Sequence, residues 1–130
     1  MDPSRSAPLA LAERRLAWLD ARQRVLAQNI AHADTPGFRP RDLPDFAQQV
    51  LRQGGGGVAL ARTDPQHVAP SRDPRARVDR TARETEPSGN AVSLDREALK
   101  VADTDTAHAL AVQLHRSWLG MFRTALGRGQ

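Results

Sequence analysis

The sequence predicts an all-α fold: a coiled-coil-like antiparallel pair of long N- and C-terminal helices, a short third helix, and an irregular, partly extended middle. Small and apolar residues recur at alternating spacings of three and four near the N-terminus, and apolar residues also line a candidate long helix near the C-terminus. Residues 54–88 are instead rich in Gly, Pro and Arg. The 130 residues include only two Trp and three Phe and no Tyr, too few for a large globular core.

The first helix is expected over about residues 9–33. Its apolar face carries residues at the spacing with which helices pack on one another, among them Leu16, Leu19, Leu26 and Ile30. Pro36-Gly37 follows. Pro suits the second position of a type II turn, and Gly accepts the positive φ that the third position requires. The helix should therefore end in a tight turn.

After this turn, Asp42 or Asp45 can cap a short helix that has Phe46, Val50 and Leu51 on one face. From Arg52 to Arg83 the chain carries seven Arg against three Asp. We expect a flexible N-terminus at 1–8, a discontinuous helical core at 9–53 and 89–126, and a flexible connecting segment at 54–88 that becomes ordered on a partner.

The second long helix is expected to begin at Asp95, which is a good N-cap residue, and to run to about Leu126, where Gly127 would stop it. Polar residues interrupt its apolar pattern between Ala102 and Ala109. The clearest apolar positions lie beyond that interruption, at Leu110, Leu114, Trp118 and Met121.

Composition argues against several classes of function. The chain has no Cys, so it contains neither a disulfide framework nor a reactive thiol. It has no apolar stretch near the roughly 20 residues that span a bilayer, and its N-terminus lacks the apolar core of a cleavable signal peptide. His67 is isolated, and the Asp103–His108 segment lacks the Gly and distant Glu of a calcium loop. We therefore expect no enzyme activity, catalytic residue, metal or cofactor.

The segment 29–38 reads Asn-Ile-Ala-His-Ala-Asp-Thr-Pro-Gly-Phe and resembles the N-terminal signature of the bacterial flagellar rod and hook axial proteins. His32 stands where a second Asn is usual, and Phe38 where Tyr is usual. The residues that match the family turn motif are Asn29, Ile30, Ala31, Asp34, Thr35, Pro36, Gly37 and Phe38. Segments 41–46, 60–68 and 89–97 resemble a short proximal-rod member of that family.

The resemblance implies a structural subunit of the proximal rod of the bacterial flagellum basal body, in the periplasm, needed for flagellum-dependent motility. Such a subunit polymerises by helix packing into the drive shaft and is exported by the flagellar type III apparatus without a cleavable signal. The implied partners are copies of itself, the next rod protein, the rod adaptor FliE, the membrane-ring protein and the export gate. The implied assembly residues are Leu16, Leu19, Leu26, Ile30, Leu110, Leu114, Trp118 and Met121.

Two other functions stay open at this point. The formal net charge of +4 and the basic middle would suit a small nucleic-acid-binding protein, although no aromatic residues are interleaved with the arginines. A helical export chaperone or adaptor is a third possibility. The apolar stripes also allow two arrangements, because they can pair with each other in a monomer or pack against neighbouring subunits.

Overall fold

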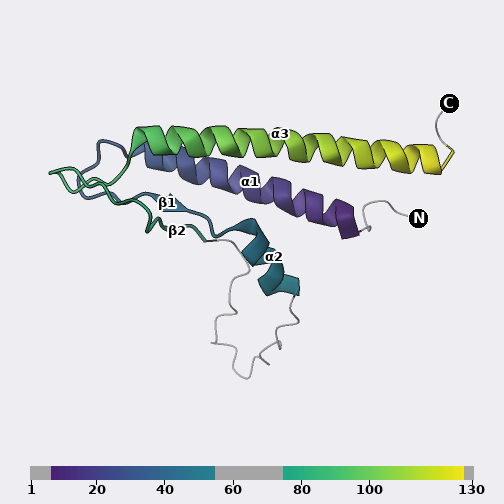
Figure 1. Cartoon of the computed structure of the whole chain (residues 1–130), viewed down its shortest axis with the longest axis horizontal. Helices are drawn as coiled ribbons and strands as arrows, with labels where there is room; N and C mark the ends of the chain where they lie inside the picture. Colours follow the sequence, from purple (N-terminus) through teal and green to yellow (C-terminus); the bar gives the residue numbers. More distant parts are fainter. Residues whose placement is uncertain (1–6, 55–74, 128–130) are drawn as a thin grey trace, which may run out of the picture.

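The computed structural model describes residues 7–54 and 75–127. Two long helices dominate it, α1 (Ala7–Ala31) and α3 (Leu94–Ala125), and they lie side by side in antiparallel orientation (Figure 1). Between them come strand β1 (Arg41–Asp42), helix α2 (Phe46–Gly54) and strand β2 (Arg77–Val78). The predicted mostly helical fold is confirmed, with a small two-stranded ribbon in addition. We call the end where α1 stops and α3 begins the turn end.

Polar contacts between α1 and α3 show how the two helices are aligned. Gln23 of α1 bonds to Asp105, and moving along the pair, the imidazole Nε2 of His108 lies 3.2 Å from Asp20 Oδ1. One heptad further, His115 Nε2 lies 3.8 Å from Glu13 Oε1. The partners advance along α3 as they retreat along α1, so the antiparallel orientation expected from the sequence is confirmed.

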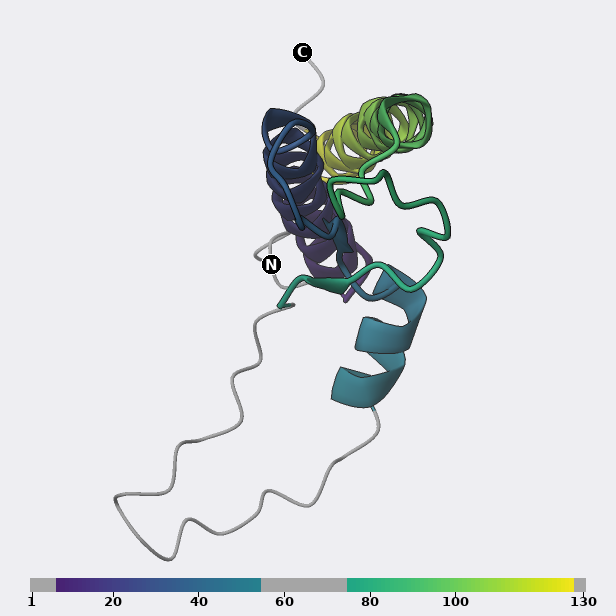
Figure 2. The same cartoon turned by 90° about the vertical axis from the view of Figure 1, so that its left-hand side faces the viewer.

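The hydrophobic core is small and lies where α2 meets the helix pair. It contains Trp18, Leu19, Leu43 and Ala111, with Phe46 packed against them. The Trp18 indole N–H donates to the Pro44 carbonyl at 3.0 Å. The centroids of the Trp18 and Phe46 rings are 6.1 Å apart. Figure 2 looks along the helix pair and shows α2 and the ribbon on one side of it.

The start of α2 confirms one of the two predicted caps. The backbone N–H of Ala47 donates to Asp45 Oδ1 at 3.2 Å, so Asp45 is the capping residue. Asp42 belongs to β1 instead. Val50 is half-buried, whereas Leu51, expected on the same face, is exposed.

The expected N-cap of α3 is wrong by two residues. Ser93 is the N-cap, with extended backbone and no capping hydrogen bond from its side chain. Asp95 and Glu97 lie in the first turn, where a negative charge still interacts favourably with the helix dipole. At the other end Gly127 has φ +68° and donates its N–H to the Thr124 carbonyl at 3.1 Å, so the predicted stop is confirmed.

Residues 75–88 belong to the expected connecting segment, yet they lie against the helix pair. Strand β2 pairs antiparallel with β1, with Arg41 opposite Val78 and Asp42 opposite Arg77. The Asp79 N–H extends the ribbon by donating to the Pro40 carbonyl at 2.8 Å. The boundaries proposed from the sequence stay a prediction, and their 55–74 part lies outside the described residues.

Candidate interaction surface

The turn after α1 has the geometry that its sequence predicts. The Phe38 N–H donates to the Thr35 carbonyl at 3.2 Å, and Gly37 between them has φ +72°. With Pro36 at the second position, this is the predicted type II turn. The His32 ring stacks on the Phe38 ring, with centroids 4.6 Å apart, and its Nδ1 lies 3.1 Å from the Thr35 hydroxyl. The two departures from the family signature therefore contact each other.

Buried Asn29 ties three segments together near the turn end. Its side-chain amide donates to the Arg41 carbonyl at 2.7 Å and to Glu97 Oε2 at 2.8 Å. Its Oδ1 accepts the Arg41 N–H at 2.9 Å. One side chain therefore satisfies both backbone groups of residue 41 and the buried carboxylate of α3. The resemblance singled out Asn29, but nothing in the sequence indicated these partners.

Buried Asn90 closes the turn from the opposite side. Its Nδ2 donates to the carbonyls of His32 at 3.0 Å and Thr35 at 2.7 Å, and its Oδ1 accepts the Val92 N–H at 2.8 Å. Carbonyl groups at and just beyond the end of a helix have no hydrogen-bond donor within the helix. The Asn90 amide donates to two of these carbonyls. Asn90 belongs to segment 89–97, which resembles the rod family, but nothing in the sequence indicated these hydrogen-bond partners.

Gly89 allows the two turns to approach closely. It has φ +81°, and a Cβ at this position would lie 3.3 Å from the Gly37 Cα. The Gly37 N–H also donates to the Ser88 carbonyl at 3.1 Å. The family turn motif is therefore a rigid corner that holds the end of α1 to the start of α3.

A cluster of charges fastens the ribbon to the helices. The Lys100 ammonium lies 2.7 Å from Asp79 Oδ2, 3.1 Å from Glu97 Oε1 and 3.7 Å from Asp42 Oδ2. Arg22 forms two hydrogen bonds of 3.0 Å to the Asp42 carboxylate. Lys100 is the chain's one lysine, but its spacing from these partners along the chain gave no signal of the cluster.

The pKa values of Asp79, Lys100 and Arg22 are shifted in the directions that favour their charged forms. Burial alone would raise the pKa of Asp79, but hydrogen bonds from Lys100 and Thr81 outweigh burial and lower it to about 2. Burial likewise opposes the charge of Lys100, but its hydrogen bonds to Asp79 and Glu97 raise its pKa. The hydrogen bond to Asp42, partly opposed by burial, raises the pKa of Arg22. The Lys100–Asp79 and Arg22–Asp42 contacts therefore stabilise the charged forms of Asp79, Lys100 and Arg22.

The face of α3 that contacts α1 is mostly small or polar. Its buried positions are seven residues apart, at Glu97, Thr104 and Ala111. Thr104 turns its hydroxyl back to the Lys100 carbonyl at 2.6 Å. Leu110, Leu114 and Met121 lie beside this face and are about half exposed, whereas Trp118 stands seven residues after Ala111, in line with it, and is the least exposed of the four.

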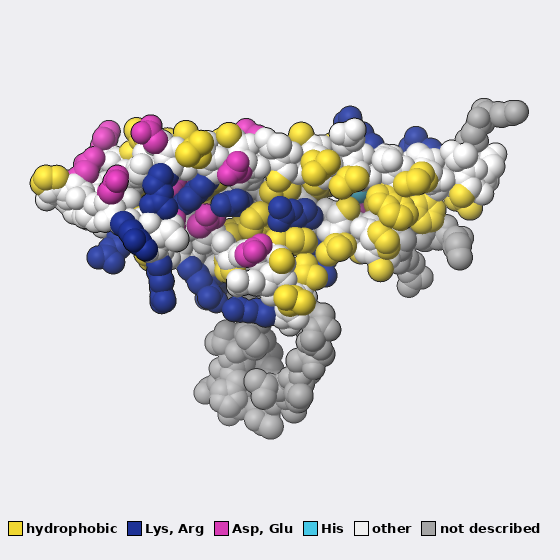
Figure 3. Space-filling model, in the orientation of Figure 1, with side chains coloured by type: hydrophobic (Ala, Val, Ile, Leu, Met, Phe, Trp, Pro, Cys, Tyr) yellow, Lys and Arg dark blue, Asp and Glu magenta, His cyan; other side chains and the backbone are white. Residues whose placement is uncertain are grey.

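The assembly residues predicted from the sequence divide between two environments. Leu19 and Leu26 are buried residues of α1, and Leu16 packs beside the core. Ile30 is exposed. The four on α3 form the apolar stripe of α3, with exposed fractions of 57% for Leu110, 51% for Leu114, 37% for Trp118 and 52% for Met121. Figure 3 shows apolar side chains gathered over the C-terminal half of α3.

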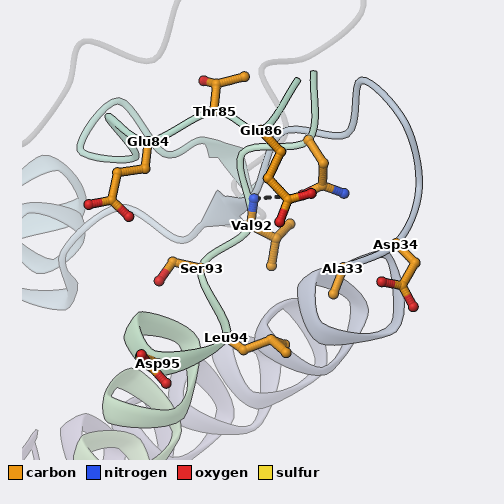
Figure 4. A pocket seen from close by; sticks show the side chains of 10 residues that line it. Ala33, Asp34, Glu84, Thr85, Glu86, Val92, Ser93, Leu94 and Asp95 are labelled. Carbon is orange, nitrogen blue, oxygen red and sulfur yellow. Dashed lines mark hydrogen bonds between the residues drawn. The ribbon is translucent and has the colours of Figure 1, made fainter. Parts of the chain in front are cut away.

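The turn end also carries a hollow of about 360 Å³. Ala33, Val92 and Leu94 supply its apolar wall. Four exposed carboxylates line its rim, Asp34, Glu84, Glu86 and Asp95. Figure 4 shows Glu84 and Asp95 on one side of the hollow and Asp34 on the other.

The histidines do not form a site of their own. His67 lies outside the described residues, and His32, His108 and His115 occupy the separate positions given above. Within 7–54 and 75–127, no group of three or more His, Asp or Glu side chains is arranged to hold a metal ion. Neither long helix contains a stretch apolar enough to cross a membrane, for the part of the chain that the structure covers.

Comparison with known proteins identifies the family. No protein-family model matches the chain. It is 37% identical over 116 residues to the flagellar basal body rod protein FlgB of Salmonella typhimurium, covering 82% of this chain and 83% of that protein. FlgB of Proteus mirabilis is 32% identical over 123 residues, covering 88% and 89%. FlgB of Agrobacterium fabrum is 32% identical over 126 residues, covering 91% of each chain. None of these relatives supports nucleic-acid binding, and the chain belongs to the FlgB family of flagellar basal body rod proteins.

Proposed function

We propose that this structural subunit of the flagellar basal body rod builds the proximal rod by packing the apolar stripe of α3 against neighbouring subunits. The observation that carries the proposal is the exposure of Leu110, Leu114 and Met121, and the partial exposure of Trp118, on a helix that already contacts α1 through Glu97, Thr104 and Ala111. Contiguous exposed apolar surface is typical of an interaction site. The FlgB relatives supply the context in which that site would be used.

The energetics favour a role in assembly over one in the monomer. Each large apolar side chain contributes roughly 1.5–3 kcal/mol when it is fully buried, before the entropy cost of association. All four stripe residues are only partly covered by the described chain. Covering them in a subunit contact would therefore stabilise the rod without altering the fold of the subunit.

The rigid corner at the turn end supports the mechanical part of the proposal. Asn29 and Asn90 hold α1, residue 41 and the start of α3 in one arrangement through buried hydrogen bonds. Torque applied to one helix would then pass to the other without a change of register. A contact between two different faces of successive copies continues as a helix, as a tubular shaft requires.

We also propose a location, an export route and partners for the subunit, as its family suggests. The subunit lies in the periplasmic part of the basal body and is exported by the flagellar type III apparatus without a cleavable signal. It contacts copies of itself, the next rod protein, the rod adaptor FliE, the membrane-ring protein and the export gate. Its function is mechanical and uses no catalysis or cofactor.

Complementation of a strain that lacks the gene tests the proposal. We expect the wild-type chain to restore swimming and to be recovered in purified basal bodies. Leu114→Asp with Met121→Asp should lower recovery at least tenfold while export of the chain continues. Gln113→Asp introduces a carboxylate at an exposed position of the same helix and should behave as wild type. Normal recovery of the double variant would show that the stripe is not an assembly surface.

A further inference from the structure

A set of exposed arginines surrounds the β1–β2 ribbon; we call it the arginine face. Its members are Arg39, Arg41, Arg75, Arg77 and Arg80. Figure 3 shows basic side chains gathered over the ribbon, below an edge on which acidic side chains gather. The ribbon's own carboxylates do not neutralise this face, because Asp42 and Asp79 are engaged by Arg22 and Lys100.

Within the described residues, no ion pair joins the arginine face to a carboxylate. The described residues likewise show no ion pair at the four exposed carboxylates around the hollow at the turn end. The chain therefore presents two unneutralised surfaces of opposite charge. Electrostatic complementarity of this kind sets the orientation and selectivity of a contact.

We infer that the arginine face of one subunit docks against the acid-rimmed hollow of a second copy standing beside it. This inference rests on the proposed function, since it names the pairing of surfaces by which neighbouring subunits meet. Both surfaces lie in the half of the molecule nearest the turn end (Figures 1 and 3). Two parallel copies standing side by side therefore bring one surface level with the other.

The chemistry of the hollow suits an arginine. Its wall of Ala33, Val92 and Leu94 can pack against the aliphatic part of the side chain, and the rim carboxylates can receive the guanidinium. The two surfaces are different patches of one chain, so the contact is heterologous and does not close into a dimer. It repeats from each copy to the next, which is the geometry of a ring or helix of subunits.

Charge reversal in both directions tests this pairing. Arg77→Glu with Arg80→Glu should reduce the amount of the chain in purified basal bodies at least tenfold, because like charges would then face each other. Adding Glu84→Arg with Glu86→Arg to the same chain should restore recovery to within about twofold of wild type. Arg52→Glu reverses an exposed arginine of α2 and serves as the matched control.

A cross-link tests whether the occupant is a second copy. The chain has no Cys, so Arg80→Cys with Glu86→Cys introduces the only thiols. Oxidation of basal bodies should give a ladder of linked copies, whereas each single-cysteine variant should not. Wild-type recovery of the first reversal, absence of rescue by the second, or cross-links to other proteins alone would overturn the inference. If the wild-type chain itself were absent from basal bodies, the proposed function would be wrong instead.

Discussion

Asn29 on α1 and Glu97 on α3 are both buried and are joined by a hydrogen bond of 2.8 Å between the amide Nδ2 and the carboxylate Oε2. The bond crosses the helix pair next to the turn end, where Asn29 also binds both backbone groups of Arg41. A stripe of leucines would pack there equally well. The buried polar contact instead accepts only one register of α1, α3 and β1.

Replacing Asn29 by Ala should therefore be costly. It leaves the buried Glu97 carboxylate with one partner fewer and leaves the Arg41 N–H and carbonyl without their partners in a partly buried position. We expect the free energy of unfolding to fall by at least about 2 kcal/mol in urea denaturation. The exposed neighbour Gln28→Ala should change it by less than about 0.5 kcal/mol. Equal effects of the two substitutions would contradict this role for Asn29.

Two glycines should respond in opposite ways to Ala. Gly89→Ala places a Cβ 3.3 Å from the Gly37 backbone at a φ of +81°, so we expect a loss of about 1–3 kcal/mol. Gly120 lies within α3, and a Cβ there meets nothing within 4 Å. Gly120→Ala should therefore stabilise the chain by up to about 1 kcal/mol. The melting temperatures of both variants measure these changes. A stabilising Gly89→Ala would argue against the close approach of the two turns.

The charge cluster predicts how stability changes in acid. The folded pKa of Asp79, about 2, lies below the ordinary 3.8, so its contribution is present above pH 4 and is lost as the pH falls toward 2. Asp79→Asn should reduce the dependence of stability on pH between 4 and 2. Circular dichroism during urea titration at several pH values measures this, and an unchanged slope would mean that the Lys100–Asp79 pair is not retained in solution.

Substitutions at Leu26 and Leu114 should distinguish an effect on folding from an effect on assembly. Leu26 is 0% exposed, so Leu26→Ala should lower the free energy of unfolding by about 2–5 kcal/mol. Leu114 is about half exposed, so Leu114→Ala should cost less than about 1 kcal/mol in the isolated chain but weaken incorporation into basal bodies. Similar losses of stability for both variants would show that the stripe already belongs to the monomer core.

The sequence predicted the long helices, the type II turn and a cap at Asp42 or Asp45, of which Asp45 is the one observed, because each depends on residues close together in the chain. Local spacing also showed where α3 is apolar. It could not show that α1 contacts a different face of α3, because the seam through Glu97, Thr104 and Ala111 looks like a solvated surface when read alone. Pairing with α1 makes this face buried, and its polar groups are satisfied there.

The charge cluster and the hydrogen bonds from Asn90 to the His32 and Thr35 carbonyls were not predicted, for a similar reason. Lys100 and Asp79 are 21 residues apart, and Asn90 and Thr35 are 55 apart. Such contacts arise only after the ribbon and the turns are placed by the helices. For the apolar stripe of α3, by contrast, the sequence shows which positions are apolar and the fold shows that they are exposed.

A role for this chain in the rod requires most directly that the stripe of α3 becomes covered there. The chain has no Cys, so Leu114→Cys gives a unique thiol in the middle of the stripe. We predict that a water-soluble maleimide labels this thiol readily in the purified monomer and at least tenfold more slowly in intact basal bodies. Equal labelling rates in the two states, with normal recovery of the variant in basal bodies, would contradict this role.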